Sequence, residues 1–98
     1  MSFPVALDPE ARTEFDDGYD LYEGRQTKLG RTFADAVESV LRGIGATPKM
    51  HAVVFGDIRR AVVRGFPYCI YYLEEPALVP VISVFHTSRD PKIWQSRV

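Results

Sequence analysis

The sequence predicts an α+β fold: an N-terminal strand and an α-helical hairpin packed on a mainly antiparallel three- to four-stranded sheet, then a short C-terminal helix. Two observations support this prediction. Apolar residues recur at helical spacing in the first half, whereas the second half holds β-branched and aromatic runs separated by turn residues. Because the chain has 98 residues, we expect one domain with one modest core, spanning residues 1–98.

The first element is a short apolar stretch, residues 3–7, which suits a strand with Pro4 at its start. Asp8, Pro9 and Glu10 then mark a helix start, since they supply a capping side chain, a proline for the first turn and a favourable negative charge. An apolar stripe at spacings of four, four and three follows on this helix. Its members are Ala11, Phe15, Tyr19 and Tyr22.

A second helix is predicted after a turn within residues 24–30, starting near Arg31 or Thr32 and ending before Pro48. Its apolar positions repeat at helical spacing. They are Phe33, Val37, Val40, Leu41 and Ile44. Two amphipathic helices joined by a short turn should form an antiparallel hairpin, with each stripe buried against its partner and the rest of the chain.

Three strand-like runs follow, at residues 58–65, 68–74 and 78–86. Turn residues separate them, with Gly65 and Pro67 after the first run and residues 75–77 after the second. Consecutive runs joined by tight turns imply antiparallel hairpins. Residues 49–57 show no clear periodicity.

The net charge of −1 combines an acidic half with a basic half. Residues 1–48 carry nine acidic and five basic side chains (−4), and residues 49–98 carry four acidic and seven basic side chains (+3).

Composition excludes several classes of protein. No apolar run is long enough to span a bilayer, and the N-terminus lacks the pattern of a signal peptide. Two histidines and the single Cys69 are too scattered for a metal site, and no nucleotide-binding motif occurs, so no cofactor is predicted. One unpaired cysteine suits a reducing cytoplasm, with Cys69 acting as a small hydrophobic residue.

The candidate functional residues follow the strands, and VFHTSRDPKIW (residues 84–94) is the most informative segment. Arg60 and Arg64, four apart on one predicted strand, should share a face, and His86 and Arg89 lie at the end of another. A titratable imidazole among guanidinium groups suits RNA cleavage, which needs a proton acceptor and cations on the phosphate. The alternative is an ordinary strand end: an Arg89–Asp90 ion pair in a turn, Asp90 capping a short helix, and Trp94 anchoring that helix.

Two other sets of residues have structural explanations. Tyr68, Tyr71 and Tyr72 are predicted to pack in the core rather than to stack on a nucleobase. The acidic residues of the first helix are predicted to form a solvated face. They are Glu14, Asp16, Asp17, Asp20 and Glu23.

Over nearly its whole length the sequence resembles the RelE/ParE family of toxins from bacterial type II toxin–antitoxin systems. Four segments carry the resemblance: DPEARTEFDDGYDLYE, LGRTFADAVESVLRGI with a following proline, RRAVVRGFPYCIYY and VFHTSRDPKIW. The resemblance implies a helical hairpin on a mainly antiparallel sheet. It also implies a cognate antitoxin whose C-terminal segment wraps the toxin in a hetero-oligomer, in modules known for plasmid stabilisation and growth arrest.

The family has two branches with different targets. RelE-like members cut mRNA on the ribosome with basic residues and a histidine or tyrosine, a pattern that His86, Arg64 and Arg89 would match here as catalytic residues. ParE-like members inhibit DNA gyrase and need no catalytic residues. The segment HTSRDP is more similar to the corresponding segment of ParE-like members, and no tyrosine follows His86. The resemblance therefore favours a gyrase inhibitor, with Arg60, Arg64, His86, Arg89 and Trp94 as binding residues and the ribonuclease as the alternative.

Overall fold

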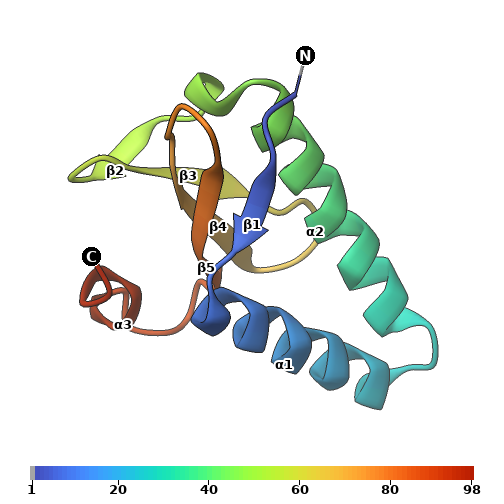
Figure 1. Ribbon diagram of the computed structural model, residues 1–98. Coiled ribbons are helices and arrows are strands. Elements are labelled where there is room, and N and C mark those ends of the chain that lie inside the picture. Colours follow the sequence, from blue (N-terminus) through green and yellow to red (C-terminus); the bar gives the residue numbers. More distant parts are fainter. Residues whose placement is uncertain (1) are drawn as a thin grey trace.

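A computed structural model describes residues 2–98 and shows a five-stranded sheet with two long helices on one face (Figure 1). The elements in chain order are β1 (Val5–Leu7), α1 (Pro9–Arg25), α2 (Leu29–Ala46), a 3-10 turn η1 (Pro48–Met50), β2 (Val53–Phe55), β3 (Ile58–Val62), β4 (Tyr68–Leu73), β5 (Val79–His86) and α3 (Lys92–Gln95). In this described part, no helix has the length and apolar content needed to cross a membrane. The predicted fold class is confirmed.

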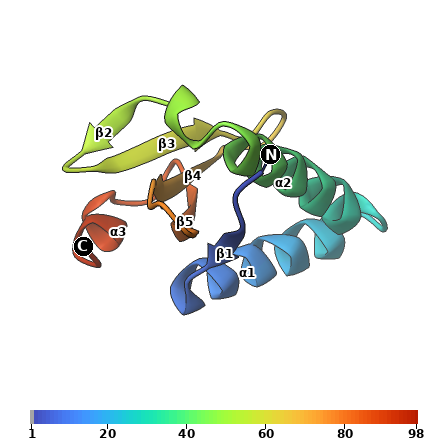
Figure 2. The same ribbon diagram turned by 45° about the horizontal axis from the view of Figure 1, so that its top comes forward.

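The sheet order is β1-β5-β4-β3-β2. Only the β1–β5 pair is parallel; β2–β3, β3–β4 and β4–β5 are antiparallel. The sheet has more strands than the three or four predicted, because β2 lies in the stretch without periodicity. It forms a hairpin with β3 around Gly56, whose φ of 56° is a left-handed conformation that glycine adopts readily. Figure 2 shows β2 at the far edge of the sheet.

The turn between α1 and α2 is stabilised by Glu23. Its carboxylate accepts the backbone N–H groups of Lys28 and Gly30, both at 3.0 Å. Lys28 has a φ of 76°, so the chain reverses there and α2 begins at Leu29, earlier than the predicted Arg31 or Thr32. The prediction that Glu23 belongs to a solvated face was wrong, because this side chain caps the following helix.

The larger core lies between the hairpin and the sheet. Phe33 is at its centre, fully buried, with the rings of Tyr22 and Tyr68 at 5.2 and 4.9 Å. The stripes predicted on both helices supply its helical side, and Tyr68, Ile70 and Tyr72 supply part of its sheet side.

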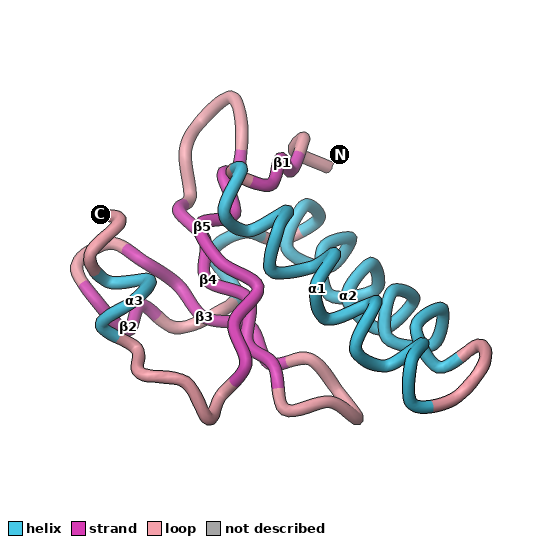
Figure 3. Tube along the Cα trace, turned by 90° about the horizontal axis from the view of Figure 1, so that it is seen from below, coloured by secondary structure: helices cyan, strands magenta, loops and turns pink. Residues whose placement is uncertain are grey.

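A smaller core lies on the opposite face of the sheet, the side on which α3 lies (Figure 3). Its members are Ile58, Cys69, Tyr71, Ile82, Phe85 and Trp94. The burial predicted for Cys69 and for the tyrosines of β4 is confirmed. Side chains of β4 alternate between the two cores: Tyr68 and Tyr72 point toward the hairpin, whereas Cys69 and Tyr71 point toward α3. The sheet is therefore apolar on both sides.

Burial of these side chains predicts a loss of stability at alkaline pH. Desolvation raises the pKa of Tyr68, Tyr71 and Tyr72 above 10.0, and that of the Cys69 thiol above 9.0. The unfolded chain therefore loses these protons first as pH rises. We expect the free energy of unfolding to be insensitive to these groups below about pH 8 and to fall above it, first through the Cys69 thiol and then through the tyrosines.

Urea unfolding at about pH 7 and about pH 10.5 measures this effect as a drop in the midpoint. Tyr72→Phe removes one ionising group, so the midpoint of this variant should fall less steeply with pH than that of the parent. Equal midpoints at the two pH values would contradict the prediction.

Candidate functional site

His86 is the last residue of β5 and lies half-buried beside the hairpin. It pairs in register with Tyr68, and the two rings meet edge to face at 5.1 Å. The backbone N–H of Ser88 donates to His86 Nδ1 at 3.1 Å, and Ser88 Oγ lies 2.7 Å from the same nitrogen. A ring nitrogen that accepts an N–H carries no proton itself, so this hydrogen bond assigns Nδ1 as an acceptor.

A pocket of about 350 Å³ opens between α1 and the end of β5. Its lining residues are Glu14, Asp17, Gly18, Leu21, Tyr68, Val84, His86 and Arg89. The structure thus brings His86 and Arg89 together, as predicted, but places them beside two carboxylates from α1. The guanidinium of Arg89 lies 3.5 Å from Glu14 Oε2 and 5.3 Å from the centre of the Phe85 ring.

Glu14 connects most of the parts around this pocket. It accepts hydrogen bonds from Ser83 Oγ at 2.8 Å and from the backbone N–H of Val84 at 3.3 Å. Arg97, near the C-terminus, forms two parallel contacts with it at 3.0 and 3.2 Å, and also donates to the carbonyl of Ile82 at 3.3 Å. β1 pairs only with residues 79–81 of β5 and leaves the rest of that strand edge uncovered. On the uncovered part, the side chain of Glu14 satisfies the Val84 N–H and that of Arg97 satisfies the Ile82 carbonyl.

The prediction that Glu14 lies on a solvated helix face was therefore wrong, since its side chain is 9% exposed. Its position could have been read from the sequence: it lies three residues after Ala11 and four before Gly18, which are both buried. The carboxylate was assigned to the surface by residue type rather than by helical position. The predicted Arg89–Asp90 ion pair is replaced by the Arg89–Glu14 contact.

Gly18 allows the close approach of α1 to Phe33 and Tyr68 at the floor of the pocket. A Cβ at this position would lie 2.8 Å from Phe33 Cζ and 3.2 Å from the Tyr68 hydroxyl. We expect Gly18→Ala to lower the free energy of unfolding by about 1–2 kcal/mol, because overpacking outweighs the better helix propensity of alanine.

Gly24→Ala is the matched control, measured by urea unfolding alongside. No atom lies within 4 Å of a Cβ at Gly24 in the same helix, so this variant should gain about 0.5–1 kcal/mol. A Gly18→Ala protein as stable as Gly24→Ala would show that the α1–Phe33 contact is not tight.

Arg60 and Arg64 do not join the pocket around His86. The prediction that they share a strand face was wrong, because β3 ends at Val62 and Arg64 lies in the turn before β4. Arg60 pairs in register with Tyr71, which places it on the α3 side of the sheet. The Arg64 turn does reach the end of β5, where the backbone N–H of Thr87 donates to the carbonyl of Pro67 at 2.8 Å.

Trp94 lies on the α3 side and is buried, with 2% of its surface exposed. Its ring stacks on Tyr71 with centroids 3.9 Å apart and planes at 18°. Asp90 Oδ1 accepts the backbone N–H of Lys92 at 3.0 Å. The helix begins at Lys92 with Pro91 as its N-cap, so Asp90 lies one residue before the predicted capping position. The anchoring role predicted for Trp94 matches the geometry.

The pocket geometry bears on catalysis. Cleavage at a phosphate needs several cations on one oxyanion, together with a group that takes a proton. Here the only guanidinium among the pocket-lining residues faces Glu14, and Asp17 adds a second carboxylate. Within residues 2–98, no three His, Cys, Asp or Glu side chains cluster as metal ligands would.

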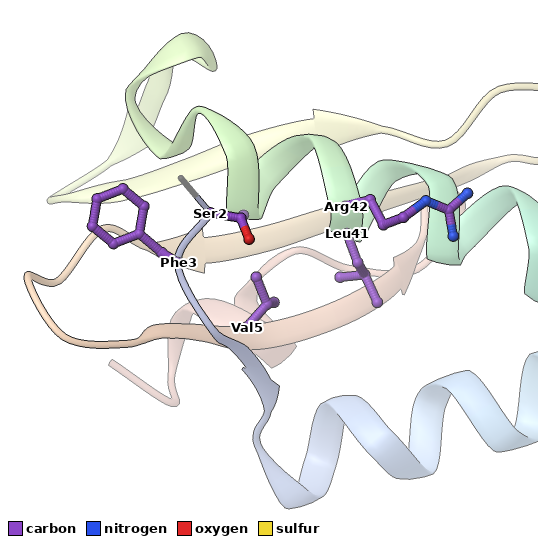
Figure 4. Close-up of a pocket in the computed structure, with 6 residues that line it drawn as sticks. Ser2, Phe3, Val5, Leu41 and Arg42 are labelled. Carbon is purple, nitrogen blue, oxygen red and sulfur yellow. The ribbon is translucent and has the colours of Figure 1, made fainter.

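A second, apolar groove of about 450 Å³ lies between the N-terminal segment and α2 (Figure 4). Val5 and Leu41 face each other across it, and Phe3 and Arg42 stand at its rim. Phe3 is 42% exposed. Arg42 forms no ion pair with any side chain of residues 2–98.

Comparisons with known proteins agree with this architecture. A search of curated proteins finds no significant match. A chain described as "Chromosomal ParDE TA system from P. aeruginosa" has a similar structure, with a TM-score of 0.74 over 87% of this chain and 96% of that chain. The two are 14% identical, so the likeness concerns the fold.

The sequence itself matches a family model over residues 5–91, most of its length. The model describes the ParE toxin of the type II toxin–antitoxin system parDE. The chain therefore belongs to the ParE toxin family.

Proposed function

We propose that this protein is the toxin of a type II toxin–antitoxin module and arrests growth by inhibiting DNA gyrase in the cytoplasm. The family match over residues 5–91 supports the toxin role. The observation that favours gyrase over RNA is the composition of the His86 pocket. Arg89, the guanidinium among its lining residues, faces Glu14, and Arg60 lies on the other face of the sheet, so the pocket offers a phosphate no unpaired guanidinium.

A cognate antitoxin neutralises the toxin by laying a C-terminal segment on it, and the groove between Phe3 and α2 suits such a segment. Val5 and Leu41 would receive an apolar side chain, and the unpaired Arg42 would pair with a carboxylate of the antitoxin. Toxin and antitoxin together form a hetero-oligomer in this proposal.

The second candidate is a ribosome-dependent mRNA endoribonuclease. It is favoured by one observation: His86 and Arg89 line the same pocket, and the turn that carries Arg64 adjoins the end of β5. In this role His86 would move the proton and Arg64 and Arg89 would hold the phosphate.

Two measurements separate the candidates: supercoiling by gyrase in the presence of the purified protein, and mapping of cellular mRNA 5′ ends after the protein is induced without antitoxin. We expect the purified protein to inhibit supercoiling, and the mRNA to show no new 5′ ends within minutes of induction. New ends at a fixed codon phase, abolished by His86→Ala and Arg89→Ala, would overturn the gyrase proposal in favour of the ribonuclease. Growth that continues unchanged would overturn both.

A further inference from the structure

A surface that is both apolar and basic lies on the side of the sheet away from the hairpin. We call it the β3 face and define it by Phe55, Arg60, Val62 and Ile93; Arg64 is exposed in the turn that follows β3. Val62 is 62% exposed, and Phe55 and Ile93 are 40% and 38% exposed. None of these residues lines the His86 pocket or the groove beside α2.

The exposed residues of the β3 face come from β2, β3 and α3. Arg60 and Val62 lie on this side because they pair with Tyr71 and Cys69, whose side chains point toward α3. The ring of Phe55 meets Trp94 at 5.6 Å, and Trp94 stacks on Tyr71. Tyr71 in turn pairs in register with Arg60 on β3. The exposed residues of the β3 face therefore lie around the packed rings of Tyr71 and Trp94.

The charges on this face lack partners within the chain. Across residues 2–98, six cations form ion pairs with carboxylates, whereas Arg60, Arg64 and the neighbouring Lys92 form none. Within residues 2–98, Arg60 and Lys92 therefore remain available to carboxylates of another molecule.

Exposed apolar side chains interleaved with arginine are typical of the centre of a protein–protein interface. Interfaces with nucleic acid are more polar and far more basic, and a chain with a net charge of −1 lacks that character. We propose that the β3 face is the target-binding surface of the toxin, and that it docks on an acidic protein surface with an apolar centre. This inference rests on the proposed function, in which that partner is DNA gyrase.

Two substitutions test the proposal, with Arg31→Glu as a control that makes the same charge change on exposed α2. Arg60→Glu reverses the central charge, and Val62→Lys replaces an apolar contact by a cation. Binding to purified gyrase from the host would be measured for each variant. We expect both to weaken binding by about tenfold or more and Arg31→Glu to leave it unchanged.

Binding of the cognate antitoxin and the urea midpoint show that each variant is folded. A parent protein that fails to bind gyrase would overturn the proposed function, and this inference with it. A parent that binds while Arg60→Glu and Val62→Lys bind equally well would overturn the inference alone. Val62→Lys also separates a protein partner from nucleic acid: tighter binding of a fluorescent single-stranded RNA by this variant, with loss in Arg60→Glu, would assign the face to RNA.

Discussion

Replacing Trp94 with alanine should lower the free energy of unfolding by about 3–4 kcal/mol. The indole is 2% exposed and is the main contact of α3 with the sheet, through Tyr71 at 3.9 Å and Phe55 at 5.6 Å. Its removal leaves a cavity, because four-residue α3 has no other buried side chain with which to refill the space. Urea unfolding followed by far-UV circular dichroism measures the loss, since the protein contains one tryptophan and the variant has none.

Trp94→Phe is the matched control for this prediction. The indole Nε1 is buried without a hydrogen-bond acceptor, so phenylalanine removes an unsatisfied donor while keeping most of the ring. We expect it to lose less than about 1.5 kcal/mol. If Trp94→Ala were no less stable than Trp94→Phe, α3 would not be docked on the sheet, and the β3 face would lose its support.

The regular elements could be predicted because each has a short-range cause. The stripe Ala11, Phe15, Tyr22 has helical spacing, and the runs on either side of Pro67 are rich in β-branched and aromatic residues. β2 escaped prediction because a three-residue edge strand, exposed along its length, has no buried side to impose a period of two. The end of β3 was placed too late for a related reason: Val63 is buried beyond the last paired residue, so the apolar run is longer than the strand.

The candidate site depended on contacts between distant residues, which local patterns do not encode. His86 and Arg89 are three apart and were grouped correctly, as neighbours in sequence remain neighbours in the fold. Arg60 was assigned to the same group, but the register of β3 with β4 turns it to the opposite face. Glu14 joins the pocket from a position 69 residues before its partner Ser83, and no pattern in the sequence links the two.

Glu14→Ala should lower the free energy of unfolding by about 3 kcal/mol. The substitution leaves Ser83 Oγ and the Val84 N–H without an acceptor at a half-covered strand edge, and leaves the Arg97 guanidinium without its carboxylate. The value lies at the lower end of the range for broken buried ion pairs, because the Arg97 side chain is 19% exposed and can still be partly hydrated. Urea unfolding is again the measurement.

A double-mutant cycle with Arg97→Ala separates the ion pair from the hydrogen bonds to β5. We expect a coupling of about 1–2 kcal/mol, so the double variant should be more stable than the sum of the single losses predicts. Glu14→Gln keeps acceptors for Ser83 and Val84 but not the charge, and its loss should fall near half that of Glu14→Ala. Additive losses would show that Arg97 is held by the Ile82 carbonyl instead. In that case Glu14 stabilises the edge of β5 directly, and the C-terminal segment would stay docked without it.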